Sequence, residues 1–143
     1  MMFRQQSIIM TFFALDVSRN MTMAARMEAL STLRDFISRM RSGDRICITY
    51  FDTSYLVHGD PINIDDAEAI EEMMGIVEQN LRTASLGGEY GSYLVPFQVT
   101  EALINNYVDD IGNENVLFIL SNDTDITFAS NYYNDMSYRM ANA

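Results

Sequence analysis

One short stretch, residues 8–16, constrains the fold of this chain more than any other. Its apolar part, rich in Ile and Phe, ends abruptly at Asp16. A run of this length and composition is typical of a buried strand. Because nothing inside such a strand needs a carboxylate, we expect Asp16 at the carboxyl end of the strand. In open α/β sheets ligands bind at that end, so the stretch predicts a polar binding site just after residue 16.

Two further polar residues, Ser18 and Asn20, follow at alternate positions before a helical pattern begins. Together with Asp16 they offer a carboxylate, a hydroxyl and an amide from one loop. Oxygen ligands of this kind suit a hard cation such as Mg²⁺. The loop therefore predicts a candidate cation site built on Asp16, Ser18 and Asn20.

The chain has the size and composition of one folded domain. Its 143 residues, 48% of them hydrophobic, are enough for a single domain over residues 1–143 with its own core. The single cysteine, Cys47, lies between two isoleucines and is expected to be a small buried residue. A lone cysteine fits a reducing compartment, and no apolar run reaches the ~18 residues of a membrane-spanning helix. We therefore expect a cytoplasmic protein.

The charge of the chain limits its partners. The formal charge is −11, from 20 acids and 9 bases, and every base is an Arg. Such acidity argues against nucleic-acid binding, which needs a basic footprint. It suits a cation or a basic protein partner, and it equally suits an acidic surface that only keeps the protein soluble.

Several enzyme classes are disfavoured by the residues present. Without Lys, the Gly-rich residues 87–92 cannot form a Walker A phosphate loop. A Ser-His-Asp hydrolase needs a Gly-x-Ser-x-Gly elbow, and none accompanies the single histidine, His58. We expect His58 to be a strand surface residue and the protein to have no catalytic residues and no enzymatic activity.

The hydrophobic patterns predict an α/β fold. The expected strands are 8–16, 44–52, 55–59 and 116–120, and the expected helices are 23–41, 65–81 and 93–109. A strand, a long helix and a strand in succession imply a right-handed parallel crossover, whereas the short turn at 52–54 predicts an antiparallel edge strand. In the first helix the apolar face is expected to run from Met23 to Met40, with the arginines, Arg26 among them, on the other side.

Residues 15–21 resemble the Asp-x-Ser-x-Ser loop of von Willebrand factor type A domains, which begins the metal-ion-dependent adhesion site of that family. Asn20 stands where the family has its second serine. Gly43-Asp44-Arg45 and Phe51-Asp52 also resemble the family's turn and strand end. The resemblance covers residues 7–125 and implies a Rossmann-like three-layer sandwich with a mostly parallel sheet and one antiparallel edge strand.

Two later segments extend the resemblance. Gly87-Gly88-Glu89 is similar to the family's Gly-Gly-Thr loop, with Glu89 in the threonine position. The apolar strand 116–120 followed by Ser121 and Asn122 is similar to a strand that ends in Thr-Asp-Gly. Asn122 replaces the family's acid, and Asp123 is an adjacent substitute. The metal ligands that the resemblance implies are Asp16, Ser18, Asn20, Glu89, Asn122 and Asp123.

The resemblance also implies a function. In the family a partner's acidic side chain fills an open coordination position on Mg²⁺, so we expect a protein–protein interaction module that binds at the carboxyl-end loops. A metal-free structural or assembly subunit, including a homo-oligomer, is the main alternative, and a small Mg²⁺-dependent phosphohydrolase is a third. Intracellular family members often work beside AAA+ ATPases of the MoxR kind, which implies such a partner here.

Residues 126–143 depart from the family pattern. They contain no long apolar strand, whereas the family normally continues with at least one more parallel strand. The fold is therefore expected to be short at the C-terminus. The outer side of strand 116–120 is left for the tail, a partner or further chain to cover.

Overall fold

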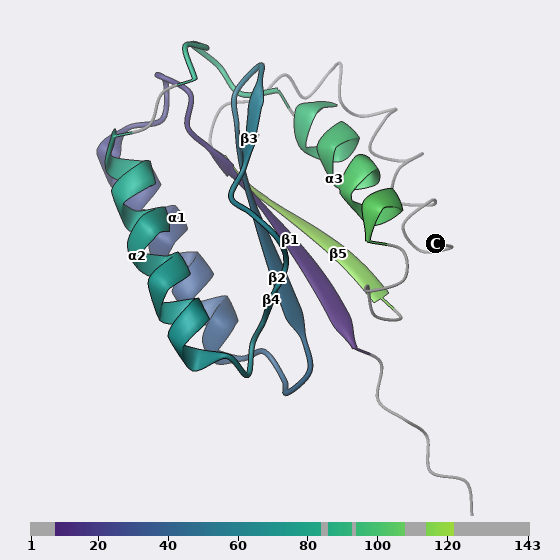
Figure 1. Ribbon diagram of the computed structural model, residues 1–143. Coiled ribbons are helices and arrows are strands. Elements are labelled where there is room, and N and C mark those ends of the chain that lie inside the picture. The colour runs from purple at the N-terminus through teal and green to yellow at the C-terminus, as the bar shows by residue number, and fades with distance from the viewer. Residues whose placement is uncertain (1–7, 84–85, 93, 108–113, 122–143) are drawn as a thin grey trace, which may run out of the picture.

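The computed structural model describes residues 8–83, 86–92, 94–107 and 114–121, and these form an α/β fold (Figure 1). A mixed five-stranded sheet is combined with three helices. The strands are β1 (Ile9–Asp16), β2 (Arg45–Phe51), β3 (Tyr55–Val57), β4 (Ile62–Asn63) and β5 (Glu114–Leu120), and the helices are α1 (Met23–Ser38), α2 (Ala67–Thr83) and α3 (Leu94–Asn106).

The sheet is organised around β1. The strand order is β3-β2-β1-β5, and β1 pairs in parallel with both β2 and β5. The predicted antiparallel strand is confirmed, because β3 pairs antiparallel with β2 at one end of this order. The two-residue strand β4, which also pairs antiparallel with β2, was not predicted, since it is too short to show a periodic pattern.

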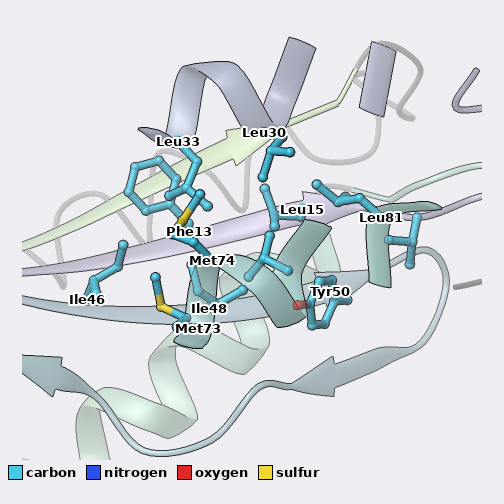
Figure 2. Packing of buried hydrophobic residues seen from close by; sticks show 12 residues of the cluster. Phe13, Leu15, Leu30, Leu33, Ile46, Ile48, Tyr50, Met73, Met74 and Leu81 are labelled. Atoms are coloured by element: carbon cyan, nitrogen blue, oxygen red, sulfur yellow. The ribbon is translucent and has the colours of Figure 1, made fainter. Parts of the chain in front are cut away.

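The helices cover both faces of the sheet, with α1 and α2 on one side and α3 on the other (Figure 1). Alternate residues of β1 point to opposite faces. Phe13 and Leu15 pack among side chains of α1 and α2 (Figure 2), whereas Met10 and Phe12 pack against α3. Because β1 is buried on both faces, its sequence is a continuous apolar run and not an alternating one.

The predicted face of α1 is wrong at two positions. Met23, assigned to the core, is 46% exposed, and Arg26, assigned to the outer side, is only 7% exposed. The buried residues of α1 are Arg26, Ala29, Leu30 and Leu33. Arg26 is buried because its guanidinium donates to backbone carbonyls of the loop before α1 and of Leu81 in α2, an arrangement that no periodicity reveals.

Helix ends differ from the predictions by a few residues. α1 ends at Ser38 and not at 41, and α2 begins at Ala67. The cap of α2 is Asp66, whose Oδ1 accepts from the Ala69 N–H at 3.1 Å. Asp65, where the helix was predicted to begin, instead accepts hydrogen bonds from Ser42 and Gly43. No helix in the described ranges is long and apolar enough to cross a membrane. The atypical segment 126–143 lies outside the described residues.

Candidate functional site

Polar residues stand at the carboxyl ends of three neighbouring strands. β1 ends at Asp16, β2 is followed by Asp52, and β5 is followed by Ser121. The strand register pairs Asp16 with Phe51 and Leu15 with Leu120. Asp16 therefore stands between Asp52 and Ser121, at the carboxyl ends of the parallel strands.

Asp16 is a buried carboxylate with a partner on each oxygen. The residue is 1% exposed. Oδ1 accepts from the Ser18 N–H at 2.8 Å, and Oδ2 accepts from the Ser121 hydroxyl. A carboxylate removed from water needs such partners, because burying an unpaired charge is very costly.

Ser18 contributes the least satisfied oxygen of the site. The residue is fully buried, and its Oγ has no hydrogen-bond partner among the described residues. A buried hydroxyl without a partner costs about 1–3 kcal/mol of desolvation. This atom lies two residues from Asp16, where a bound cation would use a hydroxyl ligand.

Arg26 fixes the loop that carries Asp16 and Ser18. Its Nη2 donates to the carbonyls of Val17 (3.0 Å) and Ser18 (2.9 Å), and its Nε donates to that of Met21 (3.1 Å). Its Nη1 reaches the Leu81 carbonyl, near the end of α2, at 2.9 Å. Burial lowers the pKa of Arg26, and the charge of Asp16 opposes that shift. Arg26 is a structural clamp that the sequence interpretation missed, because an arginine in a helix usually faces solvent.

A second loop, residues 87–92, lies against the first through backbone contacts. The Arg19 N–H donates to the Gly88 carbonyl and the Asn20 N–H to the Glu89 carbonyl, both at 3.0 Å. Arg19 Nη2 also donates to the Gly87 carbonyl at 3.0 Å. Gly91 packs directly on Asp16, because a Cβ there would collide with the Asp16 carboxylate. The two loops predicted to converge are therefore adjacent.

The structure brings some of the six predicted ligands together and leaves others apart or undescribed. Asp16, Ser18 and Asn20 share one loop, and the Glu89 backbone contacts Asn20, but the Glu89 residue is exposed. Asn122 and Asp123 lie outside the described residues. In the part of the chain that is described, no group of three or more His, Cys, Asp or Glu residues is arranged to hold a metal ion. Of the predicted ligands, Asp16 and Ser18 are therefore the two that are buried together in one loop.

A groove of about 330 Å³ opens beside this site, between α1 and the end of β5. Ser121, which donates to Asp16, is one of its lining residues. Its lining mixes apolar and polar residues, namely Met21, Ala25, Glu28, Ala29, Thr32, Ile119, Leu120 and Ser121.

Comparison with known proteins supports the fold and goes no further. No protein-family model and no curated protein matches the chain. The structure is similar to the crystal structure of three N-terminal domains of the type V pili tip protein Mfa5 from Porphyromonas gingivalis, with a TM-score of 0.54 and 14% identity. The match covers 79% of this chain and 19% of that chain, so this chain spans about a fifth of that structure's length. At this identity the similarity indicates a shared α/β fold and not a shared function.

Proposed function

We propose that this chain is a protein-binding module of the von Willebrand A type, which engages a partner through the loops at the carboxyl ends of β1 and β5. The observation that carries the proposal is the pairing of a buried acid, Asp16, with a buried hydroxyl, Ser18 Oγ, that has no partner among the described residues. Both lie where ligands bind in open α/β sheets.

The chemistry of the site fits Mg²⁺. Mg²⁺ prefers oxygen ligands, keeps several waters and is commonly held by one or two carboxylates. Ser18 would supply a hydroxyl ligand, Asn20 an amide oxygen and Asp16 the negative charge. Glu89 and Asp123 are the acids available for further charge compensation. A bound Mg²⁺ would offer one coordination position to an acidic side chain of the partner.

The chain's own residues prepare the site before anything binds. Arg26 donates to the carbonyls of Val17 and Ser18, which holds the backbone of the loop that carries Ser18. Gly91 lets the second loop approach Asp16 closely. A site held in this way loses little conformational entropy on binding, which favours affinity.

One observation favours a second function, a metal-free scaffold or assembly subunit. Both oxygens of Asp16 already accept hydrogen bonds, from the Ser18 N–H and the Ser121 hydroxyl. A carboxylate satisfied by the protein can serve as a purely structural link between loops. In that case a partner would use the same surface and the groove beside α1 without a cation.

A thermal-shift titration with Mg²⁺, Mn²⁺ and Ca²⁺ separates the two functions. A cation that binds only the folded state raises the melting temperature with concentration. We expect Mg²⁺ to raise it in the wild type and in Asp35→Ala, an exposed control on α1, and to have no effect on Asp16→Ala. If the wild type shows no rise, the metal-bridged form of the proposal is wrong and the metal-free scaffold is favoured. The mass from size-exclusion chromatography then tells whether copies of the chain assemble.

A further inference from the structure

Asp52, which follows β2, is not one of the candidate ligands. The residue is completely buried. Its Oδ1 accepts from the Ser54 N–H and its Oδ2 from the Gly88 N–H, both at 2.6 Å. Its backbone carbonyl accepts from the Ser92 N–H at 3.1 Å. One residue therefore anchors the 87–92 loop near both of its ends.

Between these two anchors the loop passes over Asp16. Gly91 lies against the Asp16 carboxylate, and the Glu89 carbonyl accepts from the Asn20 N–H. Gly88 is equally restricted, because a Cβ there would lie 2.6 Å from Asp52 Oδ2. The position of the loop relative to Asp16 thus depends on a close fit between Gly88 and Asp52.

The hydrogen bonds described above hold the loop through its backbone N–H and C=O groups. Side chains of the loop are consequently available at the surface, where Tyr90 is 51% exposed and Glu89 is also exposed. A fixed backbone with outward side chains is the arrangement of a preorganised recognition loop.

We infer that Asp52 is a positioning residue of the binding site: it holds the 87–92 loop over Asp16, and ligand binding depends on that placement. This inference rests on the proposed function for its consequence in binding, but the loop-holding role of Asp52 stands independently. Asp52 acts through the loop and is not assigned as a ligand.

The chain offers a matched control in Asp44. Asp44 is also buried, and its two carboxylate oxygens accept from the backbone N–H groups of Ile9 and Arg41, both at 3.0 Å. It precedes β2 whereas Asp52 follows it, so the seven residues of the strand separate them by about 25 Å. Asp44→Ala therefore removes the same kind of buried acceptor at the opposite end of β2.

Amide hydrogen exchange read by mass spectrometry tests the loop-holding role. In Asp52→Ala we expect exchange in the 86–92 peptide to accelerate about tenfold or more, because the Gly88 amide loses its acceptor. In Asp44→Ala the same peptide should exchange as in the wild type. If Asp52→Ala fails to fold, Asp52→Asn is the second variant, since an amide has one acceptor oxygen for two N–H donors. Equal acceleration in the Asp52 and Asp44 variants would overturn the inference.

Direct binding of Mn²⁺, followed by loss of its free electron paramagnetic resonance signal, tests the consequence. We expect the Asp52 variant to bind at least about tenfold more weakly than the wild type and Asp44→Ala to bind as the wild type does. Local acceleration of exchange with unchanged Mn²⁺ affinity would overturn the dependence of binding on the loop. If the wild type binds no Mn²⁺, the metal-bridged function fails, and the exchange comparison alone decides the role of Asp52.

Discussion

The Ser121 hydroxyl donates a hydrogen bond to the Asp16 carboxylate and so joins two residues that are 105 positions apart in the sequence. The bond links the ends of the neighbouring parallel strands β1 and β5. It also places Ser121, which begins the segment similar to Thr-Asp-Gly, beside the loop that begins at Asp16. The loops of the candidate site are thus held to one another by the sheet and by a buried acid.

Removing this hydroxyl should destabilise the protein. Ser121→Ala leaves Asp16 Oδ2 without the donor that it has in the native state. We expect a loss of about 1–3 kcal/mol in the free energy of unfolding, measured by urea denaturation. The control is Ser38→Ala, whose exposed hydroxyl donates to the Asp35 carbonyl and should matter by less than about 0.5 kcal/mol. Equal losses in both variants would mean that the Asp16–Ser121 bond contributes nothing specific.

Arg26 should be far more important to stability than a surface arginine. Arg26→Met keeps most of the apolar stem but leaves the carbonyls of Val17, Ser18 and Leu81 without their charged donor. We expect a loss of roughly 3 kcal/mol or more. Arg34→Met, which breaks the exposed ion pair with Glu78, should cost less than about 1 kcal/mol. Chemical denaturation of both variants makes the comparison, and a loss below that of Arg34→Met would refute the clamp.

Two glycine substitutions should change stability in opposite directions. Gly91→Ala introduces a Cβ that collides with the Asp16 carboxylate, so we expect a loss of roughly 1–3 kcal/mol. Gly75→Ala, inside α2, meets no atom within 4 Å and should gain roughly 0.5–1 kcal/mol through helix propensity. The melting temperature of each variant, compared with that of the wild type, gives the direction of its change in stability. A stabilising Gly91→Ala would show that the second loop does not pack on Asp16.

Cys47 should be chemically inert in the folded protein. The residue is 1% exposed, and burial, with a smaller contribution from Asp60, raises the pKa of its thiol to about 12. Because the thiolate is the reactive form, alkylation by iodoacetamide at about pH 8 should be about a hundredfold or more slower in the native state than in urea. Rapid alkylation of Cys47 in the folded protein would contradict the burial of β2.

His58 should make stability depend on pH in the mildly acidic range. Burial lowers the pKa of His58 below its ordinary value of 6.5, so the unfolded chain binds the proton more readily than the folded one. Stability is therefore expected to fall as pH decreases below 6.5, and His58→Gln should fall less steeply over about pH 5.5–6.5. Urea denaturation across this range measures the difference in slope. Parallel curves for the two proteins would show that His58 titrates as it does in the unfolded chain.

Much of the architecture was accessible from local pattern alone. The apolar run before Asp16 predicted β1, and the short turn after Asp52 predicted the antiparallel pairing of β3 with β2. These predictions worked because a strand buried on both faces must be continuously apolar, and a short turn can only join antiparallel neighbours. The convergence of residues 16–20 with 87–91 also followed from the resemblance of their segments to one family's loops.

Among the described elements, the sequence by itself determined the three helices, four of the five strands and the place of the acid that ends β1, because these depend on hydrophobic periodicity over neighbouring residues. Only the tertiary structure decided that Arg26 and Asp52 are buried, since the hydrogen-bond partners of each include a backbone group that is distant in the sequence. The acceptors of Arg26 include the Leu81 carbonyl, and one donor to Asp52 is the Gly88 N–H. Both partners are far away along the chain, so no local pattern carries the information.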